Sequence, residues 1–266
     1  MARFSMSRMP LAAWGVAVVV WLTAPILIVA IMSFTDNESF RFPPSTWSLR
    51  WYRNFFEDPS WYQSLVNSVQ IALVVMVVAT LLGTAAALGL NRMRSRVGPV
   101  LQTVLLLPTV VPVLIAGIGM YSLFLRWRLT GTPMGFILAH TVLSMPFVFI
   151  SVTASLQTFD RRLEQAAAIC GASPLATFFQ VTLRIIAPGV LTGAVLSFLG
   201  SFNETIVSIF LVSPTLRTLP VQMYTSVAKE SDPTIAAAST LTTALTAVLF
   251  LVALTVRAGR SKTDEA

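Results

Sequence analysis

The sequence predicts an all-α integral membrane protein with six transmembrane helices, because it is apolar, carries little charge and contains six long apolar stretches. Of its 266 residues, 55% are hydrophobic and 11% are charged, and the mean hydropathy is +0.77. Soluble chains usually carry about 25% charged residues. A helix crosses the hydrocarbon core with roughly 20 apolar residues, and the stretches of that length are 11–34, 64–91, 98–125, 134–159, 185–211 and 234–256. Few residues remain for a soluble domain, so residues 1–266 are predicted to form a single transmembrane domain.

The first apolar stretch is predicted to be an uncleaved helix. Residues 11–34 exceed the apolar core of a signal peptide, which is about 7–15 residues long, and no small-x-small cleavage site follows them.

The distribution of charge predicts the orientation. With the N-terminus in the cytoplasm, eleven Lys and Arg residues lie inside and seven outside, as the positive-inside rule prefers. The basic triplet Arg92, Arg94 and Arg96 then falls inside, and so does the connection 160–184. An even number of spans places both termini in the cytoplasm. A net charge of +7 would suggest nucleic acid as a partner of a soluble chain; here we expect lipid and no nucleic acid.

The second and third apolar stretches carry residues that affect helix packing. Ala85, Ala86, Ala87 and Gly89 permit close helix approach. Pro108 and Pro112 free backbone carbonyls, which is tolerated only where the backbone is buried in protein or lines a cavity. A simple proline kink is the equally consistent alternative.

Small residues follow one face of the fifth stretch. Gly189, Gly193, Ser197 and Ser201 recur every four residues, and such positions share one side of a helix. This stripe predicts a closely packed interface, within the chain or across a dimer.

The same stretch contains a carboxylate at Glu204. An acidic residue at the bilayer centre costs roughly 2.5–3.5 kcal/mol and normally faces a water-filled path or a partner. Ser201, Asn203 and Glu204 are therefore the predicted substrate path. The alternatives are that Glu204 lies near the outer interface or is neutralised by another subunit.

The sequence lacks the motifs for ATP binding, disulfide formation and metal binding. There is no G-x-x-x-x-G-K-[ST] run to bind ATP phosphates. The single histidine, His140, and the single cysteine, Cys170, offer neither a disulfide nor the ligand spacing of a metal site. We expect no catalytic residue, no metal and no cofactor in this chain, and interpret His140 as a hydrogen-bonded interior histidine or a residue that lines a cavity.

The connection after the fourth stretch looks like a short helix, a sharp turn and a second helix. Residues 164–170 contain good helix formers. Gly171 suits the end of a helix and Pro174 the first turn of the next. The plainer interpretation is an ordinary interfacial helix–turn–helix.

These residues resemble the signature loop of permease subunits of binding-protein-dependent ABC importers, which reads Glu-Ala-Ala, three residues, Gly, nine residues, Ile-x-Leu-Pro. Ala166, Ala167 and Gly171 match, and Leu183 stands at the Leu position with Val181 at the Ile position. Two positions depart: Gln165 fills the Glu slot with Glu164 one residue early, and Arg184 fills the Pro slot with Pro188 four residues later. In the family this loop docks into a groove of the ATP-binding subunit. The resemblance therefore assigns the coupling contact to Glu164, Gln165, Ala166, Ala167, Gly171, Ala172, Ser173 and Leu183.

Three later segments, 202–211, 217–227 and 232–237, are similar to the polyamine branch of that family. The resemblance implies the type I importer permease fold in a bacterial inner membrane, a second homologous permease, two copies of an ATP-binding subunit that hold ATP and Mg, and an external solute-binding protein. It also implies spermidine or putrescine as the solute, although that branch often has further acidic residues where this chain has Asn203. A ferric ion, an inorganic anion or another small organic solute remain alternatives. A secondary transporter would show internal repeats and more intramembrane ionisable residues.

Overall fold

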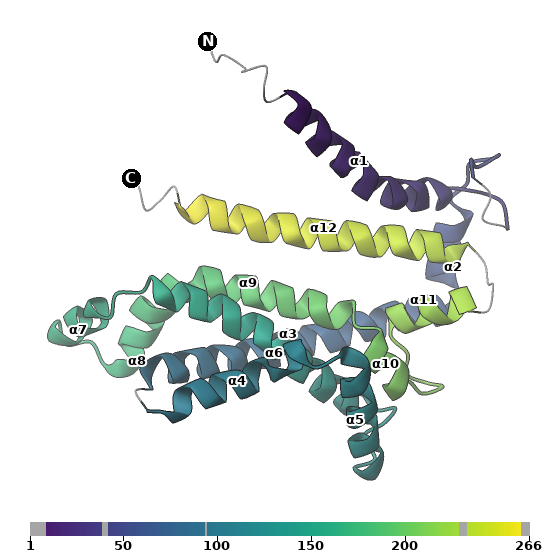
Figure 1. The fold of residues 1–266 in the computed structure, drawn as a ribbon. Helices are drawn as coiled ribbons and strands as arrows, with labels where there is room; N and C mark the ends of the chain where they lie inside the picture. Colours follow the sequence, from purple (N-terminus) through teal and green to yellow (C-terminus); the bar gives the residue numbers. More distant parts are fainter. Residues whose placement is uncertain (1–8, 39–41, 94, 229–232, 262–266) are drawn as a thin grey trace. The chain divides into compact units, whose positions relative to one another are not determined.

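The computed structural model describes residues 9–38, 42–93, 95–228 and 233–261, and helices dominate them, as predicted (Figure 1). The helices are α1 (Met9–Met32), α2 (Arg50–Glu57), α3 (Pro59–Arg92), α4 (Val97–Val110), α5 (Val113–Arg126), α6 (Pro133–Gln157), α7 (Arg162–Ile169), α8 (Pro174–Thr177), the π-helical segment Phe178–Thr182, α9 (Leu183–Phe202), α10 (Ile206–Leu211), α11 (Leu219–Ala228) and α12 (Thr234–Ser261). The predicted cytoplasmic position of the termini involves residues 1–8 and 262–266, which lie outside the described residues, as do Arg94 and Asp232.

Within the described residues, five helices are long and apolar enough to cross a membrane. Four of them, α1, α3, α6 and α12, match predicted spans. The fifth runs without interruption from Pro174 to Phe202. The predicted span 185–211 is therefore wrong at both ends: its helix begins earlier, and the chain leaves it at residues 203–205 before α10 starts. Hydropathy hides this break because residues 206–211 are apolar as well.

The predicted third span, residues 98–125, is not one helix. α4 and α5 are bent by 103° relative to each other. A proline disfavours helical geometry in the residue before it, and Val111, which precedes Pro112, is extended with ψ 128°. Each helix has 14 residues, a length of about 21 Å, which is less than the roughly 30 Å of the hydrocarbon core. Pro112 therefore breaks the helix, and a simple kink is excluded.

The broken pair still connects opposite ends of the neighbouring long helices. The Arg92 guanidinium, at the end of α3, lies 2.7 Å from the Glu164 carboxylate, just after α6. Arg161 also donates to the Asn91 carbonyl. Because two long helices end at the same place, the chain between them has to return to the far end, and α4 and α5 make that return.

The described chain divides into two compact units. The first holds the residues up to Tyr62 together with Thr225–Leu245. In it, the Tyr52 hydroxyl lies 2.7 Å from Ser33 Oγ, and Asn54 donates to Thr234 Oγ1 at 2.8 Å. The second holds Gln63–Tyr224 and the residues from Thr246 onward, and it contains the residues with the predicted functions.

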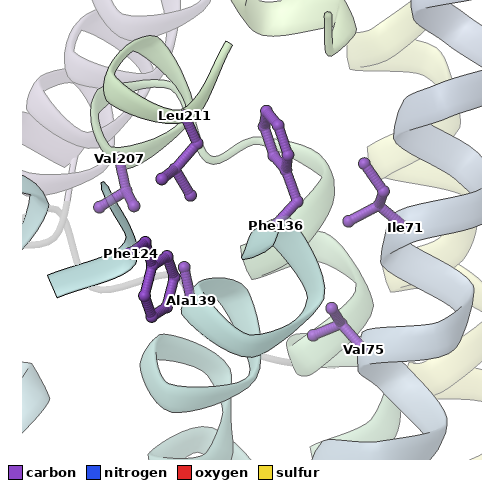
Figure 2. Close-up of a cluster of buried hydrophobic side chains, with 7 residues drawn as sticks. All are labelled: Ile71, Val75, Phe124, Phe136, Ala139, Val207 and Leu211. Atoms are coloured by element: carbon purple, nitrogen blue, oxygen red, sulfur yellow. The ribbon is translucent and has the colours of Figure 1, made fainter. Parts of the chain in front are cut away.

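Two apolar clusters build the second unit. The first joins α3, α5, α6 and α10, and Figure 2 shows its side chains gathered between these helices. Its members are Ile71, Val75, Phe124, Phe136, Ala139, Val207 and Leu211. The second joins α3, α6 and α9 through Ala79, Ala87, Val148, Phe149, Val152, Leu156 and Ile186.

Glycines bring α9 and α3 against α6. A Cβ on Gly193 would lie 2.8 Å from the Val148 Cα, and one on Gly189 would lie 2.7 Å from the Ser151 carbonyl oxygen. The predicted stripe on α9 therefore packs on α6 of the same chain, with Ser197 fully buried beside these glycines. On α3 the close approach is at Gly83, whose Cβ would lie 2.8 Å from the Val148 Cβ. Of the residues predicted to permit close approach near the end of α3, Ala87 lies in the second apolar cluster and Ala86 packs against it, whereas a Cβ on Gly89 meets no described atom of this chain within 4 Å.

We expect Gly193→Ala to destabilise the chain and Gly89→Ala to leave it as stable or more so. The first forces a methyl group against the α6 backbone, and overpacking of this kind costs about 1–3 kcal/mol. The second gains helix propensity of about 0.5–1 kcal/mol with no clash. Thermal unfolding in detergent micelles measures both, and equal midpoints would contradict the packing described.

Candidate functional site

The connection between α7 and α8 is shaped by Gly171. Its φ of +84° is left-handed, a conformation that glycine adopts without strain. The Gly171 amide donates to the Ala168 carbonyl and the Ala172 amide to the Ala167 carbonyl, both at 3.0 Å. This pair of bonds is the Schellman ending of a helix. No atom lies within 4 Å of a Cβ built on Gly171, so the backbone conformation alone requires glycine.

The second arm starts at Ser173. Its hydroxyl accepts from the Ala176 amide at 3.3 Å, and Pro174 occupies the first turn of α8, as is common at helix starts. α8 continues through the π-helical segment into α9. Leu183, which the resemblance groups with this loop, packs instead against the second apolar cluster.

Glu164 faces the interior of the unit. Its Oε1 atom accepts from the Arg92 guanidinium at 2.7 Å and from the Thr182 hydroxyl at 2.6 Å. The Glu164 side chain is 23% exposed, and Thr182 is buried. These three residues, here called the inner bracket, tie α7 to the end of α3 and to the π-helical segment. Arg92 and Thr182 could not be identified as partners of Glu164 from the sequence, because they lie 72 and 18 residues away along the chain.

Apolar side chains protrude from both arms of the connection. Ile169 of α7 is 87% exposed and Leu175 of α8 is 71% exposed, and Phe179 is exposed as well. Gln165 and Ala166 also lie on the surface. Figure 1 shows α7 and α8 at one end of the second unit. Large exposed apolar residues mark surfaces that meet lipid or another protein, and we call Ile169, Leu175 and Phe179 the apolar tip.

The predicted substrate path lies at the other end of the same helix, in the break between α9 and α10. Asn203 is exposed, and its side-chain amide folds back onto the Leu199 carbonyl at 3.0 Å. Glu204 is half-buried, and its Oε1 atom accepts from the Val207 amide at 2.9 Å. Within the described part of the chain, no ion pair neutralises Glu204. Ser201 is buried and contacts His140.

His140 is an interior, hydrogen-bonded residue, as predicted. It is 1% exposed, and each of its ring nitrogens lies within 3.0 Å of a serine hydroxyl. The described residues contain no group of three or more His, Cys, Asp or Glu that could hold a metal ion.

Comparison with known proteins places the chain among transport components. Residues 79–259 match the family described as "Binding-protein-dependent transport system inner membrane component". The chain is 31% identical over 228 residues to the putrescine transport system permease protein PotI of Escherichia coli (strain K12), which covers 83% of this chain and 81% of PotI. It is 28% identical over 249 residues to the spermidine/putrescine permease PotC of the same strain, covering 92% and 93%. The molybdenum transport system permease ModB of Mycobacterium bovis is 30% identical over 258 residues, covering 91% and 92%.

A solved structure shares the fold. A bacterial ABC transporter involved in the import of the acidic polysaccharide alginate superposes with a TM-score of 0.70 at 14% identity, over 96% of both chains. The same kind of transporter in complex with alginate pentasaccharide-bound periplasmic protein gives a TM-score of 0.71 at 17% identity, over 93% of both chains.

We expect Gly171→Ala to loosen the end of α7 and Gly171→Asn to preserve most of it. A left-handed conformation costs an ordinary residue about 1–2 kcal/mol, whereas Asn adopts it more readily. Amide hydrogen exchange of residues 167–173 in the purified chain measures the difference. Equal exchange in the wild type and Gly171→Ala would show that the Schellman ending does not govern this turn.

Proposed function

Since the chain belongs to the family of binding-protein-dependent transport system inner membrane components, we propose that it forms, together with a second homologous permease, the path of an ATP-driven ABC importer for a small solute. Family and fold confirm the predicted inner-membrane permease of a type I importer. The chain thus supplies a membrane path, and ATP hydrolysis is assigned to a partner.

The apolar tip is the observation that supports an ATP-binding subunit as the partner. Ile169 and Leu175 are exposed at the end of a loop that the inner bracket ties to α3 through Glu164. Exposing such side chains is unfavourable unless another surface covers them. We assign that surface to an ATP-binding subunit, one copy for each of the two permeases, with ATP and Mg bound there. An external binding protein delivers the solute, and one structure of the same fold is of an ABC transporter in complex with a periplasmic protein.

One long helix connects the apolar tip with the break that contains Glu204. Pro174–Phe202 has 29 residues and spans about 43 Å. Its first turn carries part of the apolar tip and its last turn adjoins Glu204. When ATP closes the partner subunits, movement of the tip is passed along this helix to the break, and the spans rock between inward and outward openings.

The solute we favour is a polyamine. Two relatives are named as putrescine or spermidine/putrescine permeases. Glu204 brings a negative charge with no cation paired to it in the described residues. A carboxylate in a narrow, partly dehydrated passage attracts a cation and repels an anion. The relative named for molybdenum transport keeps an inorganic anion as the second candidate, and Glu204 argues against it.

We expect Ile169→Asp to abolish co-purification with the ATP-binding subunit, because a charge in the apolar contact is costly to bury. Val227→Asp is the matched control, since Val227 is a similarly exposed apolar residue of α11, in the connection after α10. Affinity purification of the whole importer from membranes measures the retained subunit. Full retention in Ile169→Asp would remove the apolar tip from the interface.

We expect Glu204→Gln to slow putrescine uptake at low concentration by about tenfold, because a hydrogen bond to a charged group contributes about 1.5–3 kcal/mol. Gln keeps an oxygen that can accept from the Val207 amide, so this variant removes the charge and not the contact at the start of α10. Glu204→Ala removes both and is expected to be slower still. The measurement is the uptake of radiolabelled putrescine by cells that express the complete importer. Wild-type uptake rates in Glu204→Gln would show that Glu204 does not contribute to solute passage.

A further inference from the structure

A closed ring of hydrogen bonds surrounds the break between α9 and α10. His140 of α6 reaches across to Ser201 Oγ with Nδ1 at 2.9 Å and to Ser208 Oγ with Nε2 at 3.0 Å. Ser201 precedes the break, and Ser208 follows it. The Glu204 amide donates to the Ser201 carbonyl at 3.3 Å, and the Glu204 carbonyl accepts from Ser208 Oγ at 2.9 Å. Glu204 therefore lies between the two serines that one imidazole holds.

The network assigns the proton of the imidazole. The Ser208 hydroxyl donates to the Glu204 carbonyl, so it has to accept from His140, and Nε2 carries the hydrogen. A neutral imidazole then has an acceptor at Nδ1, which takes the Ser201 hydroxyl hydrogen. In this arrangement both imidazole nitrogens and both serine hydroxyls have a hydrogen-bond partner. Removing one hydroxyl leaves a buried partner unpaired, which is costly.

The surrounding core fixes the imidazole in turn. Ala139, the neighbour of His140 in α6, packs with Phe124 of α5 and Val207 of α10 in the first apolar cluster (Figure 2). The Phe136 ring, one turn before His140, contacts it edge-on with ring centroids 5.8 Å apart. Packing within α6 and against its neighbours therefore holds the imidazole in addition to its bonds to the two serines.

We infer that His140 is a positioning residue of the solute path: through Ser201 and Ser208 it fastens α9 to α10 across residues 203–205 and thereby sets the position of Glu204. The inference rests on the proposed role of Glu204 in solute passage. His140 does not contact the solute in this account. Its effect reaches the solute only through the backbone that presents the Glu204 carboxylate.

The test uses serine variants, because His140→Ala removes a large buried side chain and leaves a cavity that destabilises the whole fold. Ser201→Ala and Ser208→Ala each remove one link and little volume. Ser197→Ala is the matched control: Ser197 lies one turn earlier on the same face of α9, is fully buried, and its hydroxyl has no partner among the described residues. Hydrogen exchange of residues 203–211 is measured on the full chain in lipid nanodiscs, and putrescine uptake is measured in cells with the complete importer.

Loss of one link is expected to speed exchange of residues 203–211 by about fivefold in both test variants and to leave Ser197→Ala unchanged. It is expected to raise the KM for putrescine about threefold or more with little change in maximal rate, and a general loss of fold would lower the maximal rate instead. In the Glu204→Gln background, Ser208→Ala should raise KM no further, since residues that act as one unit are not additive.

Unchanged hydrogen exchange in Ser201→Ala and Ser208→Ala would overturn the inference. It would also be overturned if Ser208→Ala raised KM by the same factor in the Glu204→Gln background as in the wild type. If exchange rises while Glu204→Gln transports like the wild type, the path assignment of Glu204 fails, and the fastening of the break by His140 stands on the exchange result alone.

Discussion

The close packing of one long helix against α6 is the constraint on which the rest of the second unit depends. Pro174–Phe202 is continuous although it includes a π-helical segment and Pro188. It lies so close to α6 that a methyl group at Gly193 would strike the α6 backbone. Because interiors are packed without spare volume, this helix can shift along α6 or together with it, and cannot separate from it by small steps.

Polar contacts from neighbouring helices hold both ends of this helix. At one end, Arg92 and Thr182 meet at the Glu164 carboxylate. At the other, His140 holds Ser201 and Ser208. Packing of small residues and interhelical hydrogen bonds both stabilise helix association in lipid, and hydrogen bonds are in addition directional. Apolar packing therefore holds the long helix against α6. The inner bracket and the His140 contacts fix its position relative to α3, α7 and α10.

Much of this architecture could be predicted from the sequence, because local chemistry determines it. Gly171 and Pro174 define the turn, and the spacing of Gly189 and Gly193 defines a packed face. Three features could not be predicted in this way. The magnitude of the bend at Pro112 depends on how α5 packs on α10, where a Cβ on Gly117 would lie 2.9 Å from the Phe210 ring. The end of the long helix at Phe202 is invisible to hydropathy because apolar residues continue beyond it, and the inner bracket joins residues that are far apart in the chain.

In the proposed importer, the α7–α8 connection faces the cytoplasm and is covered there by the ATP-binding subunit, and one residue of the chain can report on both. Its single cysteine, Cys170, is exposed and adjoins Gly171. Labelling with a membrane-impermeant maleimide in sealed vesicles of both orientations tests the claim most directly. The account predicts that Cys170 reacts only in inside-out vesicles and is protected when the ATP-binding subunit is present. Reaction of Cys170 in right-side-out vesicles would contradict it.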